Sequence, residues 1–402
     1  MRRHAVDGKR HPVNGKIEIR HLNPNSKVAD FIDLHYNAYN AARLREICHL
    51  MAERVQKPGV TVGVSLSGAI IPAGFASMLV PLIEKGFIDY IVSTGANLYH
   101  DLHFGLGYDL YRSTPFADDV DLYKKRLIRI YDIIVEFDVL LKCDQFLYQL
   151  IDRPEFQRKM STAELHYLIG RYVHHGEKQT RRRGSTLLGA AYRAGVPIFT
   201  SSPGDSTIGM NIAARALTGG KLEIDVSLDV NESCAIVYEA KQKGKSAVFI
   251  LGGGSPKNFL LQTEPQLQEI LGLDVSGHDY YIQITDARPD TGGLSGATPG
   301  EAVSWGKINP EMLPNAVVCY SDTTMAFPLV ASYVLARCKP RPLKRLYDRR
   351  EALVKVLEET VRNRTARGQR SERGTIGVLQ TKSRKGGKAA SRRKRSQAGT
   401  RG

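Results

Sequence analysis

The sequence predicts an α/β protein built on a doubly wound, mostly parallel, Rossmann-like sheet with helices on both faces. Two observations predict this class. Short, nearly continuous apolar segments alternate with longer segments in which apolar residues recur at helical spacing. Strands that are apolar throughout are typical of a parallel sheet buried on both faces, and the intervening helices are typical of the crossovers that connect parallel strands.

The expected elements follow in a regular order. Residues 1–27 are polar and are expected to form a flexible leader. Apolar residues first recur at helical spacing in residues 30–56, and Pro58 and Gly59 are expected to end this helix. We then expect strands at 62–66, 88–93, 197–200, 247–251, 280–285 and 316–320. The expected helices are 72–85 (with Gly86 as the residue after its end), 185–194, 206–217, 229–243, 256–271 and 327–338.

A helical insertion is expected between the second and third strands. Residues 120–183 read as mostly helical, and residues 121–150 are strongly amphipathic. With this insertion, residues 28–361 are predicted to form one catalytic domain.

The net charge of +16 is concentrated at the C-terminal end. Residues 361–402 contain 14 Lys and Arg and one acid, Glu372. Such a segment, without periodicity or aromatic residues, predicts a disordered basic tail over 362–402. Two interpretations of this tail are weighed equally. It contacts RNA or the ribosome through phosphates, or it is a solvated extension without a partner.

Several classes of protein are disfavoured. No apolar run is long enough for a membrane span, and a polar N-terminus is unlike a signal peptide, so a cytoplasmic location is expected. The five cysteines are far apart in sequence and form no C-x-x-C pair, so neither a disulfide framework nor a metal site is expected. They are Cys48, Cys143, Cys234, Cys319 and Cys338.

Small and polar residues follow every expected strand. In a parallel sheet, ligands bind at the carboxyl ends of the strands, where small residues allow close approach to the backbone. The pattern therefore predicts a nucleotide crevice, although the G-x-G-x-x-G fingerprint is absent. The segments are Ser67-Gly68-Ala69, Thr94-Gly95-Ala96-Asn97, 201–206, 252–255, Asp286-Ala287 and 321–324.

Lys307 is the candidate nucleophile. It stands two residues after Trp305, the only Trp of the chain. A lysine is nucleophilic only when neutral, so a pKa of about 10.4 must be lowered, for example by an apolar pocket. An exposed lysine after a loop is the alternative reading of an arbitrary Gly-Lys pair.

Residues 301–308 (Glu-Ala-Val-Ser-Trp-Gly-Lys-Ile) resemble the active-site segment of deoxyhypusine synthases. Further matches occur in the family's order at 67–74, 196–199 leading to Asp205, 249–254 and 320–328. The resemblance implies NAD-dependent transfer of an aminobutyl group from spermidine, through an imine on the lysine, to an acceptor amine. In the family the acceptor is a lysine of the translation factor that carries hypusine, and the enzymes are homotetramers with sites at subunit interfaces.

The resemblance also assigns roles to residues. It places Lys307 at the nucleophile position, with Trp305 and Glu301 beside it as further catalytic candidates. It places the following residues at NAD-contacting positions: Gly68, Ala69, Pro72, Thr94, Gly95, Ala96, Asp205, Gly253, Asp286, Ala287, Asp322 and Thr323.

The amine side departs from the family. Its paired glutamates fall on Tyr99 and His100, two further acids on Met210 and Leu294, and a histidine on Asn258, while Ser295 is kept beside Leu294 as a substrate candidate. Unpaired ammonium groups are costly to bury, so these departures predict an amine smaller or less charged than spermidine. Binding should weaken as pH falls through the histidine range near 6.5. His100 is also a catalytic candidate through pairing with Asp101, weighed evenly against a polar residue at the rim.

Different classes of function stay open. One is an NAD-dependent aminobutyl transferase that acts on a protein lysine or on a free amine, as in homospermidine synthesis. Another is a non-catalytic NAD-binding protein with a basic nucleic-acid-binding tail. Lys307 favours the first and the missing acids favour the second. An NAD-dependent deacylase has no support beyond glycine-rich turns.

Overall fold

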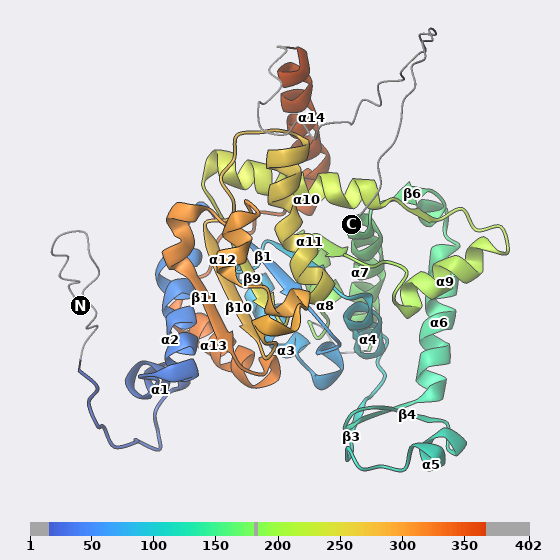
Figure 1. Ribbon diagram of the computed structural model, residues 1–402. Coiled ribbons are helices and arrows are strands. Elements are labelled where there is room, and N and C mark those ends of the chain that lie inside the picture. Colours follow the sequence, from blue (N-terminus) through green and yellow to red (C-terminus); the bar gives the residue numbers. More distant parts are fainter. Residues whose placement is uncertain (1–15, 181–183, 367–402) are drawn as a thin grey trace, which may run out of the picture.

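The computed structural model describes residues 16–180 and 184–366. At its centre lies a six-stranded sheet in the order β11-β10-β9-β1-β2-β7, in which every neighbouring pair is parallel (Figure 1). The chain starts in the middle at β1, winds outward to β7, and then returns to β9 and winds outward to β11. This order confirms the doubly wound α/β class. The strands are β1 (Val60–Leu66), β2 (Tyr90–Ser93), β7 (Ile198–Thr200), β9 (Lys245–Leu251), β10 (Tyr280–Thr285) and β11 (Ala316–Tyr320).

The register brings the carboxyl ends of the strands to one edge. Leu66 at the end of β1 is paired with Ser93 of β2 and with Leu251 of β9. Farther out, Ser93 is paired with Thr200 of β7, and Thr285 of β10 with Tyr320 of β11. The polar segments that follow these strands therefore emerge along a common edge, as the sequence predicted.

Helices cover both faces of the sheet. Alternate residues of β9 show this directly, because Ala247, Phe249 and Leu251 lie in one hydrophobic cluster and Val248 and Ile250 in the other. The first cluster includes side chains of α1 (Val28–His35), α2 (Tyr39–Leu50), α3 (Ala76–Glu84), α8 (Leu187–Ala194) and α13 (Thr323–Arg337). The second includes side chains of α10 (Val226–Lys243), α11 (Gly254–Pro265) and α14 (Arg350–Ala366).

The expected helical insertion contains strands as well as helices. Residues 121–150 do not form one amphipathic helix, because an antiparallel sheet in the order β3-β5-β4 interrupts them. The β-branched runs 127–130 and 133–135 favour strands, and two residues, Tyr131 and Asp132, connect them as a hairpin. The insertion consists of β3 (Tyr111–Arg112), α5 (Asp119–Lys124), β4 (Leu127–Ile130), β5 (Ile133–Glu136), α6 (Phe137–Ile151), β6 (Lys159–Met160) and α7 (Thr162–Gln179).

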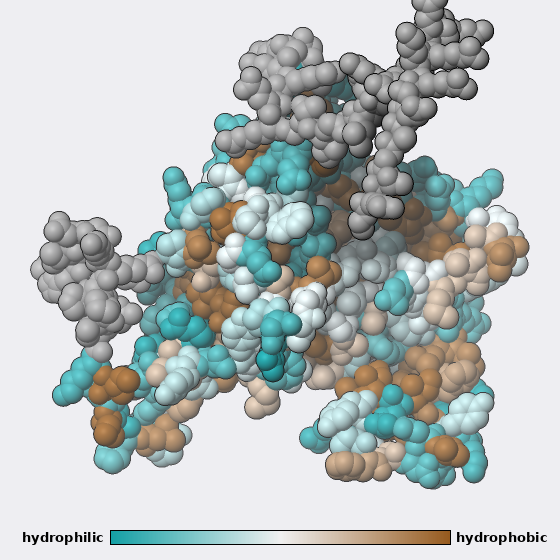
Figure 2. Space-filling view, viewed as in Figure 1, coloured by the Kyte–Doolittle hydropathy of each residue, from teal (hydrophilic) through white to brown (hydrophobic). Residues whose placement is uncertain are grey.

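The hairpin region projects from the body (Figure 1) and stands off from it in the space-filling view (Figure 2). Its large apolar side chains include several that face solvent, among them Phe116 at 90% exposure. Two smaller pieces complete this side of the molecule: α9 (Thr207–Ala216), which packs on α6, and β8 (Glu223–Ile224), which pairs with β6.

Three other expectations about helices need correction. The helix expected over 30–56 is divided at residues 36–38 into α1 and α2, followed by the π-helical turn η1 (Met51–Val55). There, Asn37 donates through its side chain to Leu34 O (3.2 Å), a bond that competes with helical hydrogen bonding. Helix α4 (Gly95–Gly105) was not expected, because its glycine and threonine start read as a turn. Helix α14 was not expected either.

Helix α14 bears on the predicted end of the domain. It packs against α10 and runs past residue 361, the last residue assigned to the domain. Most of the predicted tail, 367–402, and residues 1–15 of the predicted leader lie outside the described residues. In the part that is described, no helix combines the length and apolar character that crossing a membrane requires.

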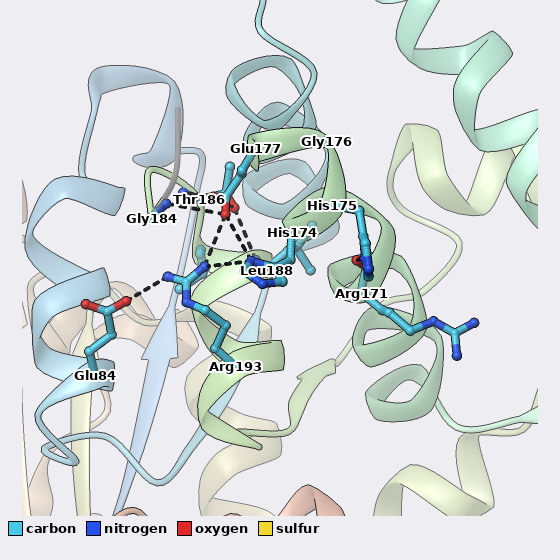
Figure 3. A network of polar contacts seen from close by, with 12 residues as sticks. Glu84, Arg171, His174, His175, Gly176, Glu177, Gly184, Thr186, Leu188 and Arg193 are labelled. Carbon is cyan, nitrogen blue, oxygen red and sulfur yellow. Dashed lines mark hydrogen bonds and ion pairs between the residues drawn. The ribbon is translucent and has the colours of Figure 1, made fainter. Parts of the chain in front are cut away.

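A buried carboxylate ties three helices together beside the sheet. Glu177 of α7 is fully buried and accepts hydrogen bonds from Thr186 N–H (2.9 Å) and from Arg193 Nη1 (3.1 Å). Arg193 of α8 also donates to Glu84 Oε1 of α3 (2.7 Å), so its guanidinium lies between the two acids (Figure 3). Removal of a partner from a buried ion pair leaves an uncompensated charge, which is strongly destabilising.

We therefore expect Glu177→Ala to lower the free energy of unfolding by about 3 kcal/mol. Glu84→Ala is the matched control, because it removes the exposed partner of the same arginine and should cost less than about 1 kcal/mol. Urea unfolding of the two variants measures both values. Equal effects would show that burial of Glu177 does not determine its contribution.

Candidate active site

The site lies where the direction of winding reverses, between β1 and β9. The ends of these strands are joined through Ser67, whose hydroxyl accepts a hydrogen bond from Gly253 N–H (2.9 Å) and donates to Gly253 O. In doubly wound sheets this switch point opens the crevice in which ligands bind.

The glycines at this edge have different surroundings. A Cβ atom on Gly253 would lie 2.4 Å from Ser295 Cα, and one on Gly95 would lie 2.4 Å from Ser206 Cβ. These two glycines therefore serve close packing between loops. Gly68 differs, because its φ is +61° and no heavy atom lies within 4 Å of a Cβ built on it. Gly68 is thus a position where a ligand could approach the backbone.

Three acids expected to contact NAD are exposed at the same edge. Asp205 follows β7 and Asp286 follows β10, and among the described residues neither side chain has a hydrogen bond or ion pair. Asp322 follows β11 and caps α13, since its Oδ1 accepts from Thr324 N–H (2.7 Å) and Met325 N–H (3.1 Å). A nucleotide's hydroxyl groups require acceptors of this kind.

The remaining NAD candidates shape the edge. Thr94 caps α4 and donates to Gly68 O (2.6 Å). Asn97, which was not singled out from the sequence, accepts from Ile70 N–H (2.8 Å) and Ile71 N–H (3.1 Å) and so links the ends of β1 and β2. The other candidates lie at the same strand ends and are buried or half-buried: Ala69, Pro72, Ala96, Ala287 and Thr323.

Lys307 lies in the loop after α12 (Pro299–Ser304) and is half-buried. Its Nζ donates to Asn258 Oδ1 of α11 (3.2 Å) and lies 5.7 Å from the centre of the Trp305 ring. Burial lowers the pKa of Lys307, and the nearby Glu269 carboxylate opposes this effect in part. The environment thus favours the neutral amine, in the direction that nucleophilic chemistry requires.

Glu301 and Trp305 flank this lysine in different ways. Glu301 forms a capping box with Thr298, in which its Oε2 accepts from Thr298 N–H (2.6 Å) and Thr298 Oγ1 (3.0 Å). These hydrogen bonds lower the pKa of Glu301 and keep the carboxylate ionised. The Trp305 side chain is 62% exposed, so within this chain it borders the lysine without enclosing it.

Lys257 also helps to build the site, although it was not selected from the sequence. It precedes Asn258 on α11, is 3% exposed, and donates to Ala297 O (2.8 Å) and Gln283 Oε1 (3.1 Å). Burial lowers the pKa of Lys257 to about 8. Its neighbour Ser295 accepts from Gly254 N–H through Oγ (2.9 Å), which fixes the loop that leads to α12.

The pairing of His100 with Asp101 is wrong. Asp101 is fully buried and accepts from Leu187 N–H (2.9 Å) and Leu188 N–H (2.8 Å), so it caps α8. His100 instead contacts His103, with 3.1 Å between Nδ1 and Nε2. Adjacent residues on α4 point in different directions, and the buried acid satisfies the start of a neighbouring helix.

The expected pH dependence of amine binding assumed an ordinary histidine pKa, and His100 does not meet this assumption. Burial lowers the pKa of His100 to about 4, so the ring remains neutral through the ordinary histidine range. Tyr99 is buried and donates to Asp144 Oδ1 (2.8 Å). Met210 and Leu294 expose 64% and 50% of their surface. The structure brings Asn258, Trp305 and Lys307 together. Among the described residues, Tyr99 and His100 form no hydrogen bond or ring contact with Lys307.

The family model described as deoxyhypusine synthase matches residues 32–334. The chain belongs to the deoxyhypusine synthase family. A deoxyhypusine synthase-like protein of Nostoc punctiforme is 60% identical over 346 residues, which cover 86% of this chain and 89% of that protein. "Probable deoxyhypusine synthase 2" of Methanosarcina acetivorans is 37% identical over 311 residues, covering 76% and 86%.

The fold is shared with a solved structure of an Entamoeba histolytica protein assigned as a deoxyhypusine synthase. The TM-score is 0.54 at 14% identity, with 81% of this chain and all of the other covered. The resemblance found in the sequence is thus confirmed. Family membership supports aminobutyl transfer as the general type of reaction, in a family that is generally NAD-dependent.

Asn258 should control the reactivity of Lys307. Asn258→Asp places a carboxylate beside Nζ, which favours the ammonium form and should slow acylation of Lys307 several-fold near neutral pH. Asn258→Leu removes the acceptor and increases desolvation, so acylation should begin at lower pH than in the wild type. Competitive labelling with acetic anhydride, followed by mass spectrometry against exposed lysines, measures both. Identical profiles in the two variants would mean that Asn258 does not tune the amine.

Proposed function

We propose that the protein is an NAD-dependent aminobutyl transferase in which Lys307 carries the transferred group. The observation that carries this proposal is the half-buried Lys307 amine, held by Asn258 within the segment that resembles the family's active site. Burial favours the neutral form that attacks carbon. A lysine with no chemical task would be more stable with its ammonium group fully hydrated.

The residues divide the work as follows. NAD, when held at the strand ends by Asp205, Asp286 and Asp322, would supply the acceptor for a hydride from the carbon beside the amine nitrogen and the source of the hydride that completes the transfer. Lys307 attacks the resulting carbon–nitrogen double bond, the departing amine takes the proton that Lys307 loses, and an imine remains between Nζ and the four-carbon unit. The acceptor amine then adds to the same carbon and releases Lys307. Asn258 Oδ1 accepts from Nζ and holds the amine in place between these steps.

The strand edge fits a dinucleotide. The space beside Gly68 is open, and the carboxylates of Asp205 and Asp286 have no side-chain hydrogen bond or ion pair among the described residues. Asp322 uses Oδ1 to cap α13, and its side chain remains exposed. The parallel strands also direct the N-termini of α4 and α11 toward this edge, where amide groups favour phosphate.

The amine side supports a substrate smaller or less charged than spermidine. Met210 and Leu294 are uncharged, and Tyr99 already donates to Asp144. His100 carries no charge above a pKa of about 4, so it neither pairs with an ammonium group nor repels one near neutral pH. Glu301 is ionised, and its cap occupies only Oε2, so Oε1 is left to pair with an amine. Both a protein lysine and a free amine suit this site as acceptor.

We also propose that the protein forms a homotetramer. Trp305, Met210 and Leu294 are all exposed in the single chain, although they lie at positions assigned to catalysis or substrate binding. A partner subunit that covers them would exclude water from the imine and enclose the amine.

The decisive test is covalent trapping at Lys307. Lys307→Arg keeps the charge but cannot form an imine, because guanidinium stays protonated, so transfer should be abolished while NAD still binds. Borohydride should add mass to Lys307 in the wild type only when NAD and an amine donor are both present. Lys243→Arg, an exposed lysine paired with Glu239, is the control and should behave as wild type. Full product formation by Lys307→Arg would refute the covalent route.

The cofactor test uses the acids at the strand ends. Asp205→Ala should weaken NAD binding by about 1.5–3 kcal/mol, because a charged acceptor is lost. Asp322→Asn keeps a side chain that caps α13 and removes only the charge, so weaker binding there would not reflect loss of the helix start. Asp274→Ala, an exposed acid before β10 at the opposite edge, is the control. Calorimetry that gives equal affinity for all three would place NAD elsewhere.

The substrate test is a competition among diamines and triamines. The wild type should prefer an amine with fewer charges than spermidine, and the preference should be the same at about pH 6 and pH 8, because His100 stays neutral across this range. Leu294→Asp should shift the preference toward spermidine. Leu343→Asp, close to Lys344 at the amino end of β1, should not. A wild type that prefers spermidine and modifies a protein lysine would show that the replaced acids are dispensable.

A further inference from the structure

The π-helical turn η4 (Gln266–Ile270) continues α11 and contacts the backbone next to Lys307. Within this turn, Gln268 Nε2 donates to the carbonyl oxygen of Gly306 (2.7 Å), the residue before the nucleophile. A Cβ atom on Gly306 would lie 2.6 Å from Gln268 Oε1, and the φ of Gly306 is +68°. Glycine at 306 therefore allows both the turn of the chain and the approach of Gln268.

We propose that Gln268 is a positioning residue for the reaction. Its hydrogen bond to Gly306 O, together with the bond from Lys307 N–H to Ala302 O, fixes the plane of the peptide before Lys307 and thereby the direction from which the Lys307 amine reaches the reacting carbon. The inference rests on the proposed function, in which that amine is the nucleophile. Among the described residues, Gln268 has no hydrogen bond to the Lys307 amine, so it acts through the backbone of Gly306.

The orientation of the Gln268 amide is determined by its surroundings. Its Nε2 also lies 3.3 Å from Glu264 Oε2, a residue that is fully buried. Burial raises the pKa of Glu264 to about 8, and Glu264 Oε1 lies 3.7 Å from His278 Nδ1. A flipped amide would bring Gln268 Oε1 against the Gly306 carbonyl oxygen, two acceptors with no proton between them. The donor is therefore directed at Gly306.

Backbone hydrogen bonds also hold the loop around Lys307. His278 N–H donates to Lys307 O (2.9 Å), and Lys307 N–H donates to Ala302 O (2.8 Å). His278 and Ile308 also pair as a parallel bridge. Lys307 N–H and Gly306 O belong to the same peptide, so Ala302 holds this peptide at its N–H and Gln268 holds it at its carbonyl oxygen. The peptide follows a glycine, the residue whose backbone rotates most easily.

Helix α11 and its π-helical extension thus hold the lysine segment at several points. Lys257 binds the carbonyl of Ala297 ahead of α12, Asn258 binds Nζ itself, and Gln268 binds Gly306. Asn258 restrains only the tip of a long, flexible side chain. Without the hydrogen bond from Gln268, the Lys307 amine would still bind Asn258, but the backbone from which its side chain extends would shift. A displacement of a reacting atom by about 1 Å can lower the rate on the order of 100-fold.

The experiment compares Gln268→Leu and Gln268→Glu in the full chain, with Gln262→Leu, an exposed glutamine of α11, as control. Gln268→Leu should lower kcat for transfer about 10- to 100-fold, with KM for NAD unchanged. It should also shift the pH profile of Lys307 acylation, measured by mass spectrometry without cofactor or amine. Gln262→Leu should leave both as in the wild type.

The pH dependence of the transfer rate in Gln268→Glu distinguishes positioning from a structural role. A neutral glutamic acid can donate to Gly306 O, whereas a carboxylate repels it. Its transfer rate should therefore fall, relative to wild type, as pH rises through the pKa of the new acid, while the wild-type rate rises as Lys307 loses its proton. If Gln268→Leu does not fold, this pH dependence decides the question.

Two results would overturn the inference: wild-type kcat in Gln268→Leu with an unchanged acylation profile, or a Gln268→Glu rate that follows wild type at every pH. The proposed function fails separately. If Lys307→Arg transfers normally, covalent catalysis is wrong, and the acylation profile of Lys307 still reports whether Gln268 sets its position.

Discussion

The pairing of β1 with β9 at the switch point is the constraint on which the rest of the site depends. These two strands are in register over seven residues and are buried along almost their whole length. Ser67 and Gly253 continue the junction beyond the last strand residue with two further hydrogen bonds. The junction sets where the two halves of the sheet diverge, and hence where α11 begins and where Lys257 and Asn258 can reach the loop of Lys307.

Burial determines much of the electrostatics of this edge. It disfavours the charged form of each titratable group unless a partner compensates, so it lowers the pKa of Lys257, Lys307 and His100 alike. Lys257 remains useful because carbonyl and amide oxygens accept its hydrogens. The same physical effect thus supplies an amine able to attack carbon and a histidine that adds no charge to the amine side.

Sequence reasoning found the features that follow from local patterns and missed those that depend on the third dimension. The bounds of β10 and β11 agreed with expectation because each is an apolar run limited by polar or turn residues. Lys307 was selected because it follows the sole tryptophan within a specific motif, and its role stays a prediction. The hairpin at 127–136 was read as helix, since β-branched residues at mixed spacing satisfy both periods. The destination of Asp101, the start of α8 some 86 residues away, leaves no sequence signal.

The length of the π-helical turn η4 determines where the Gln268 side chain lies. A π turn closes its hydrogen bonds over five residues, one more than an α turn, and so places its side chains at different angles around the axis. Loss of one residue from 266–270 would return the segment to α-helical pitch and rotate the amide of Gln268 away from the Gly306 carbonyl, with every remaining amino acid unchanged. A substitution in this turn alters one side chain, whereas a change in its length would alter the spacing between Asn258, which binds Lys307 Nζ, and Gln268, which binds the carbonyl oxygen of Gly306.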